Sequence, residues 1–222
     1  DAIWSTIPFE PQRAATLLGI REALYRVRGV DAPLILDIDD LLSEIPTYNI
    51  ASKHLKKASD RTKIALAILR EADAITTTCR FLAEKMAPIN DRTFILPNCV
   101  EPPMWDHPRP LKNDGKVRVL WTGSSARWGD IMMMKETLFW LHDKYHDKVK
   151  LILTGTCPEF AVPWVEQGFA FVTQWAPIPD SMQVMRYIAP DIGLAPLLPN
   201  DFNRSKSPLK YLDHAMIGCA GI

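Results

Sequence analysis

The chain has 222 residues, of which 47% are hydrophobic and 23% are charged, a composition that is typical of globular domains and argues against disorder. Its 26 lysines and arginines balance its 26 aspartates and glutamates, which excludes the broad positive field that gathers nucleic acid, so any anion site must be local. The chain lacks both an apolar run of about 18 residues and a basic signal region at its start, so we expect a cytoplasmic protein.

Short apolar runs alternate with helical stripes along the whole sequence, which is the pattern of parallel sheets covered by helices. The class predicted is therefore α/β. In the first half, strands are predicted over residues 2–7, 33–38, 73–78 and 93–96. Residues 11–28 predict a helix, because apolar side chains recur on one of its faces.

Residues 97–116 hold five prolines without periodicity and predict a linker between two domains. The alternation then restarts, with strands predicted over residues 117–121, 149–153, 169–172 and 192–195, and with a helix after Asp130. We expect a partial first domain over residues 1–105 and a truncated second domain over 106–222. The first half lacks the opening strands of a nucleotide-type fold, and the second stops where a fifth strand should begin.

Asp37, Asp39 and Asp40 follow the buried apolar run of residues 33–36, at the edge where open α/β sheets bind ligands. Three carboxylates repel one another, so a cation, a lysine or hydrogen bonds must compensate. The alternative is that these carboxylates only cap the start of the next helix.

A second polar segment follows the strand predicted to end at Trp121. Gly123 lets the backbone approach a ligand closely, Ser124 offers a hydroxyl, and Arg127 offers a fork of donors to phosphate oxygens. Glycine followed by serine is also common in ordinary turns, so this motif is weak by itself.

A third polar segment lies near the end of the chain. Ser207 as N-cap and Pro208 at the first position predict the start of a helix, and Lys206, Lys210 and Asp213 follow one another along one of its faces. A helix N-terminus next to a lysine suits an anion, and a carboxylate two turns further suits ribose or sugar hydroxyls. The alternative is an amphipathic helix with a solvated polar face.

Taken in this order, the segments resemble the GT-B glycosyltransferases, especially a retaining group that shares a strand followed by Pro-Asn-Gly-Val-Asp. Residues 94–101 read FILPNCVE here, and residues 72–78, 188–196 and 211–218 are similar to further parts of that pattern. The resemblance covers most of residues 30–222. It implies two Rossmann-like domains, each with a mainly parallel sheet flanked by helices, of which the first binds the acceptor and the second the nucleotide sugar.

The activity implied by the resemblance is that of a hexosyltransferase-class enzyme, which moves a sugar from a nucleotide-diphosphate donor to a glycan or lipid-linked acceptor in polysaccharide biosynthesis. Its partners would be the nucleotide sugar and the acceptor, with peripheral membrane contact and no nucleic acid. No cofactor and no metal are expected. We assign no catalytic base, because the retaining mechanism relies on stabilising the leaving phosphate more than on a protein nucleophile. A truncated chain need not be active alone.

The resemblance also implies residue roles. Arg127 and Lys206 would neutralise the donor diphosphate, Asp213 would hold the ribose, Gly123 would leave room for the donor, and the loop that begins at Trp175 would border the base. The rest of the expected donor-binding set is Ser124, Asn203, Ser205 and Lys210. Asp37, Asp39 and Asp40 would lie in the cleft on the acceptor domain. The sequence departs from the family where Ser205 and Asp213 replace a pair of glutamates and where Cys99 replaces a glycine.

Two other functions remain open. Residues 34–41, LILDIDDL, resemble the Asp-x-Asp signature of haloacid-dehalogenase-like phosphatases, with Asp37 as nucleophile, Asp39 as general acid and Mg²⁺ between them. The threonine that usually follows two residues after the second aspartate is Leu41 here. The other possibility is a non-catalytic fragment that serves as a binding module, because folding does not require activity.

Overall fold

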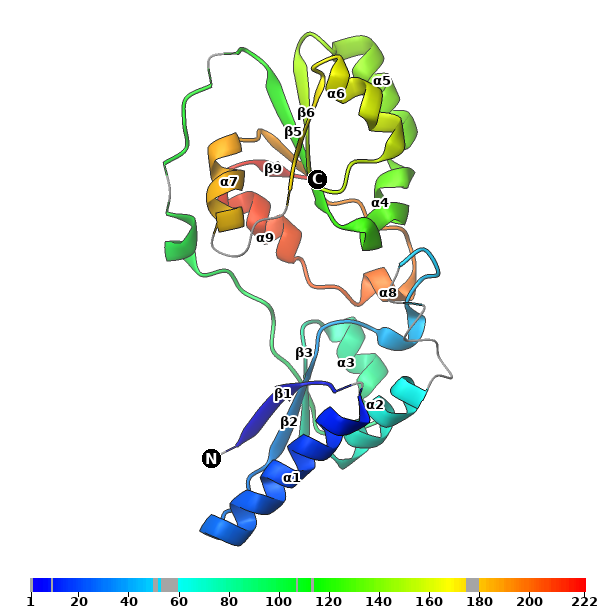
Figure 1. The fold of residues 1–222 in the computed structure, drawn as a ribbon, viewed down its shortest axis with the longest axis vertical. Helices are drawn as coiled ribbons and strands as arrows, with labels where there is room; N and C mark the ends of the chain where they lie inside the picture. Colours follow the sequence, from blue (N-terminus) through cyan, green and yellow to red (C-terminus); the bar gives the residue numbers. More distant parts are fainter. Residues whose placement is uncertain are drawn as a thin grey trace. The chain divides into compact units, whose positions relative to one another are not determined.

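The computed structural model describes residues 2–8, 10–49, 52, 60–106, 108–112, 114–174 and 180–222. Their contacts divide the chain into two compact units. Unit 1 comprises Asp1–Thr47, Ala51–Asn98 and Pro199–Ser207, and unit 2 comprises Tyr48–Ile50, Cys99–Leu198 and Pro208–Ile222. Each unit is built on a parallel sheet with helices beside it, as the α/β pattern predicts (Figure 1).

Unit 1 contains, in its described part, a four-stranded parallel sheet with the order β1-β2-β3-β4. Its strands are β1 (Ile3–Thr6), β2 (Leu34–Ile38), β3 (Ala74–Thr77) and β4 (Thr93–Ile95). The helical elements are α1 (Pro11–Arg28), the 3₁₀ turn η1 (Leu42–Glu44), α2 (Asp60–Glu71), α3 (Arg80–Met86) and, from far along the chain, α8 (Asp201–Arg204).

The core of unit 1 lies between the sheet and its helices (Figure 1). Along β2, Leu34, Leu36 and Ile38 are buried in this core, whereas Ile35 and Asp37 between them are only partly buried. Successive side chains of a strand point to opposite faces of the sheet. The Asp37 side chain therefore lies on the face of the sheet away from the core.

Unit 2 has a five-stranded sheet over the residues that are described, with the order β7-β6-β5-β8-β9, and every neighbouring pair is parallel. Its strands are β5 (Val117–Gly123), β6 (Val149–Gly155), β7 (Ala170–Thr173), β8 (Ile192–Leu194) and β9 (Ala220–Gly221). The helical elements are η3 (Pro102–Trp105), η4 (Ser125–Arg127), α4 (Trp128–Met133), α5 (Lys135–Tyr145), η5 (Glu159–Ala161), α6 (Val162–Glu166), α7 (Asp180–Ile188) and α9 (Leu209–Met216).

Apolar side chains pack against both faces of the unit 2 sheet. Val119 and Trp121 of β5 join a cluster with α4, α5 and α6, while Leu120 between them joins a second cluster with η3 and α7. The helices accordingly lie on two sides of this sheet (Figure 1). Within the described part of the chain, no helix is long and apolar enough to cross a bilayer.

Every predicted strand forms, with ends shifted by two residues at most, and β9 is the expected fifth strand of the second half. The helix predicted after Asp130 is divided at Met134 into α4 and α5. The helix predicted to start at Ser207 and Pro208 begins at Leu209 instead. The Ser207 hydroxyl does not cap it and accepts a hydrogen bond from the Asn98 amide at 2.9 Å.

The linker predicted over residues 97–116 is not an exposed tether along its whole length. Trp105 is 2% exposed and packs into the second cluster of unit 2, since an indole ring buries a large apolar area. Arg109 donates hydrogen bonds to the carbonyl oxygens of Pro190 and Gly218, at 2.5 Å each. The change of unit therefore falls between Asn98 and Cys99, earlier than the boundary expected between residues 105 and 106.

Candidate functional site

The residues expected to bind the donor and line the cleft fall into both units. Unit 1 holds Asp37, Asp39, Asp40, Asn203, Ser205 and Lys206, and unit 2 holds Gly123, Ser124, Arg127, Lys210 and Asp213. Trp175 lies outside the described residues. The two groups are described separately below.

In unit 1, Asp37 is tied to the sheet. Its carboxylate accepts a hydrogen bond of 2.5 Å from the Thr76 hydroxyl, on the adjacent strand β3. Asp37 is the next-to-last residue of β2, and the phosphatase interpretation stays an alternative.

Lys206 supplies the positive charge that the acidic run, formed by Asp37, Asp39 and Asp40, requires. Its ammonium group is 2.5 Å from the Asp40 carboxylate and 4.1 Å from the centre of the Phe202 ring, and its side chain is only 12% exposed. Partial burial, with repulsion from Asp40, raises the pKa of Asp39 above its ordinary value. In the described part of the chain, no group of three or more His, Cys, Asp and Glu side chains is arranged to hold a metal ion.

The segment that carries Lys206 is fixed to unit 1 by further polar contacts. Ser205 is fully buried, and its hydroxyl donates to the Phe202 carbonyl at 2.7 Å and accepts from the Leu41 amide at 3.1 Å. Asp201 accepts a hydrogen bond of 2.8 Å from Lys85. Asn203 is buried as well. Ser205 therefore has a structural role here, and donor-binding roles for Asn203, Ser205 and Lys206 stay predictions.

In unit 2, the polar residues lie where the winding of the sheet reverses. β5 and β8 are neighbours, but the chain continues from β5 toward β6 on one side and from β8 toward β9 on the other. Ligands of open α/β sheets bind outside the carboxyl ends of the strands at such a point. The loop that starts at Gly123 occupies this position. A Cβ atom at Gly123 would lie 2.4 Å from the Trp121 ring, so the glycine already leaves room for that ring.

Arg127 is held in place by Asp130, a residue that the sequence patterns did not single out. The Arg127 guanidinium is 3.3 Å from the Asp130 carboxylate, whose side chain is 2% exposed. The other carboxylate oxygen of Asp130 accepts a hydrogen bond of 2.9 Å from the Leu198 amide. The buried carboxylate thus joins the start of α4 to the segment after β8 and fixes the direction of Arg127.

Lys210, Asp213 and His214 form a partly buried group on α9. The Lys210 ammonium is 3.7 Å from the Asp213 carboxylate. Burial and the nearby charge of Arg127 lower the pKa of Lys210, while Asp213 acts in the opposite direction. Burial raises the pKa of Asp213 despite the attraction of Lys210. Lys210 therefore has Asp213 as its ion-pair partner and the positive charge of Arg127 nearby.

His214 was not predicted, although it lies one helical turn after Lys210. Its side chain is 1% exposed, and an added Cβ at Gly193 would lie 2.4 Å from its ring. Burial, with repulsion from Lys210, lowers the pKa of His214 to about 4, so the ring is neutral near pH 7. Neither ring nitrogen has a hydrogen-bond partner among the described residues.

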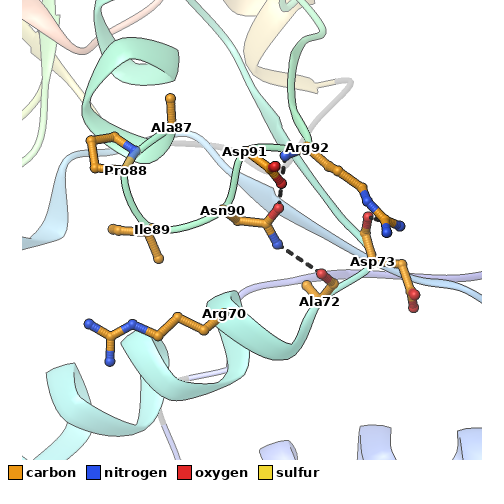
Figure 2. Close-up of a pocket in the computed structure, with 9 residues that line it drawn as sticks. All are labelled: Arg70, Ala72, Asp73, Ala87, Pro88, Ile89, Asn90, Asp91 and Arg92. Atoms are coloured by element: carbon orange, nitrogen blue, oxygen red, sulfur yellow. Dashed lines mark hydrogen bonds between the residues drawn. The ribbon is translucent and has the colours of Figure 1, made fainter.

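A different hollow, of about 390 Å³, lies at the amino ends of β3 and β4 in unit 1 (Figure 2). Asn90 donates to the carbonyl oxygen of Ala72 at 2.8 Å and accepts from the Arg92 amide at 2.9 Å (Figure 2). It also donates to the carbonyl oxygen of Leu69 at 3.0 Å. These bonds satisfy carbonyl groups at the end of α2. The hollow is at the edge of the sheet opposite Asp39 and Asp40, and its polar groups serve the fold.

Comparison with solved structures finds the same architecture in several proteins. HepE of Anabaena, solved with UDP and glucose, has a TM-score of 0.62 and 13% identity over 100% of this chain and 58% of its own. WaaG, a glycosyltransferase involved in lipopolysaccharide biosynthesis, has a TM-score of 0.56 and 13% identity over 94% of this chain and 63% of its own.

A UDP-forming trehalose-phosphate synthase from Burkholderia xenovorans has a TM-score of 0.51 and 14% identity, over 94% of this chain and 57% of its own. The sequence matches no protein-family model and no curated protein. At these identities the likeness establishes the fold alone, which is a pair of Rossmann-like domains of the GT-B type. The chain spans less than two thirds of each of the three solved chains.

Proposed function

We propose that this chain is part of a glycosyltransferase that transfers a sugar from a nucleoside-diphosphate donor to a glycan or lipid-linked acceptor. One observation carries the proposal: the Lys210 ammonium is 3.7 Å from the Asp213 carboxylate, with the positive charge of Arg127 nearby, in the unit whose sheet reverses its winding beside the Gly123 loop. Two cations that repel each other in a partly buried place are stabilised when an anion binds between them. A diphosphate is such an anion.

The same group suits the chemistry of sugar transfer. When the bond to the sugar breaks, the nucleoside diphosphate leaves with additional negative charge, and fixed cations lower the energy of that state. Arg127 can contact two phosphate oxygens with its planar fork, and Asp130 holds that fork in place. Lys210 acts as a second, point-like charge, and Asp213 accepts hydrogen bonds from ribose hydroxyls.

On unit 1, we propose that the acceptor contacts Asp39 and Asp40, which follow β2 at the carboxyl edge of the sheet. Carboxylates are strong acceptors for sugar hydroxyls. The acceptor is a glycan or a lipid-linked sugar of a polysaccharide pathway, and a lipid-linked acceptor brings peripheral contact with the cytoplasmic face of a membrane. The donor needs no cofactor in this scheme.

The test is calorimetric titration of the chain with UDP, GDP and dTDP. Arg127→Ala and Lys210→Ala should each weaken binding of the preferred nucleotide by roughly ten- to a hundredfold, because a charge-assisted contact contributes about 1.5 to 3 kcal/mol. Lys144→Ala is the matched control, since Lys144 lies in the last turn of α5, away from the Gly123 loop, and this variant should keep the affinity of the parent.

The following results would count against the proposal. The parent chain could bind none of the three nucleotides, or both cation variants could bind as tightly as the parent. Hydrolysis of an aryl phosphate that depends on Mg²⁺ and is abolished by Asp37→Asn would support the phosphatase instead. If the folded protein neither binds a nucleotide nor hydrolyses the aryl phosphate, the non-catalytic binding module remains as the interpretation.

A further inference from the structure

Tyr48 and Asn49 come from the segment between η1 and α2, in the first half of the chain. Both neighbouring elements belong to unit 1, yet residues 48–50 belong to unit 2 by their contacts. Asn49 is buried there, at 9% exposure. A short stretch of the loop that begins with the acidic run therefore forms part of the proposed donor-binding unit.

The Tyr48 ring packs against the backbone of Gly129, in the first turn of α4. A Cβ atom at Gly129 would lie 2.9 Å from Cε1 and Cζ of Tyr48 and 2.9 Å from Cδ1 of Leu198. Gly129 is therefore enclosed by Tyr48 and Leu198, and a larger residue there would have to displace one of these side chains. The Tyr48 hydroxyl oxygen is buried, and it has no hydrogen-bond partner among the described residues.

The next residue along the chain connects this contact to the proposed diphosphate site. Asp130 accepts a hydrogen bond from the Leu198 amide and pairs with Arg127 at 3.3 Å. The Tyr48 ring therefore packs against the backbone at Gly129, and the next residue, Asp130, accepts a hydrogen bond from the Leu198 amide. A shift of this turn would move the carboxylate that orients Arg127.

We propose that Tyr48 is a positioning residue for the donor diphosphate. Its ring holds the first turn of α4 against Leu198, so that Asp130 keeps Arg127 directed at the phosphates. This role rests on the proposed function. It also means that the loop that carries the acidic run helps to set the affinity for the donor.

The test compares UDP with uridine, using the preferred base if it is not uracil. Tyr48→Ala should weaken UDP binding about tenfold, because a displaced Arg127 loses part of its contact with the phosphates. Uridine has no phosphates, so its affinity should not change, whereas a general loss of structure would weaken both ligands. Tyr48→Phe keeps the ring and should bind UDP as the parent does. Tyr48→Leu is a milder variant in case the alanine variant does not fold.

A double-mutant cycle with Arg127, measured by UDP affinity, distinguishes a positioning role of Tyr48 from a purely structural one. In the Arg127→Ala background, Tyr48→Ala should cause no further loss of UDP affinity, because both changes remove the same contact. Tyr187→Ala is the matched control, since Tyr187 is a tyrosine of unit 2 that is 74% exposed on α7.

Unchanged UDP affinity in Tyr48→Ala, additive losses in the double variant, or equal losses for UDP and uridine would each overturn the proposal. If the parent binds no nucleotide, the proposed function fails. Hydrogen exchange of the α4 amides, measured without ligand, then tests separately whether Tyr48 holds the first turn of α4. Faster exchange in Tyr48→Ala but not in Tyr187→Ala would show that Tyr48 still holds the turn.

Discussion

His214 is a polar side chain in a place that offers its ring no described hydrogen-bond partner. A buried donor or acceptor without a partner costs about 1 to 3 kcal/mol, so the ring reduces stability unless another group pairs with it. The ring remains neutral because protonation would place a charge in the interior next to Lys210. The cost of His214 should therefore depend on pH.

We expect the chain to lose stability as the pH falls from about 6.5 to about 4. The unfolded histidine takes up a proton near pH 6.5, whereas the folded one does so only near its pKa of about 4. Between these values the unfolded state binds more protons, so acid favours unfolding, by up to about 3 kcal/mol at the end of the range. Urea denaturation at several pH values measures the effect.

His214→Phe is the comparison, because it keeps a flat ring over Gly193 and removes the titrating group. Its stability should fall less between pH 6.5 and 4 than that of the parent. The raised pKa of Asp213 acts in the opposite direction, since a folded carboxyl group that protonates more easily gains stability from acid. Both proteins retain Asp213, so its contribution cancels, and parallel pH profiles would contradict the prediction.

At this scale, sequence spacing identified the charged residues but not their partners. Lys206, Lys210 and Asp213 were found from helical spacing, yet the helix begins at Leu209, and Lys206 precedes it in the other unit. Asp130 and His214 were missed because a polar side chain becomes buried only through contacts with residues far along the chain. No local pattern records those contacts.

Among the elements, η3 shows how a proline-rich stretch can be part of a core. Its prolines prevented any periodic pattern, so the sequence predicted a linker, but Trp105 is 2% exposed against Leu120, Ile152 and Ile217. The strands were predictable because alternating or continuous apolar runs depend on burial alone. The division between α4 and α5 at Met134 has no such local signal.

Trp105→Ala should lower the free energy of unfolding by about 3 to 5 kcal/mol, because it leaves a large cavity in the second cluster of unit 2. Leu111→Ala is a control in the same stretch, since Leu111 is 99% exposed and its loss should change stability by less than about 0.5 kcal/mol. Denaturant titration distinguishes the two. Equal, small effects would mean that residues 102–105 are a tether after all.

At the scale of the whole molecule, residues 199–207 adjoin α9 in sequence but belong to unit 1, and this assignment can be tested. Lys206→Ala would leave Asp40 without its partner and should cost about 1 to 3 kcal/mol. We expect faster hydrogen exchange in η1 and α8 and unchanged exchange in α9. Lys63→Ala, which removes a largely exposed lysine of α2, should alter neither region.

Faster exchange in α9 of the Lys206 variant, with η1 unaffected, would contradict this assignment. The prediction also bears on the donor site. Loss of nucleotide affinity in Lys206→Ala would support the role implied by the family resemblance. Unchanged affinity would indicate that Lys206 only balances the charge of the acidic run.

Segments of each half of the chain belong to the unit formed mainly by the other half, and this limits which segments of such proteins can be exchanged by recombination. A single recombination breakpoint near residue 98 would join the first half of one gene to the second half of another. The resulting chimaera would combine Leu41 and Asp40 of one parent with Ser205 and Lys206 of the other, and Tyr48 of one with Gly129 of the other. Transplanting a donor specificity by a simple fusion should therefore fail unless residues 48–50 and 199–207 are chosen to match.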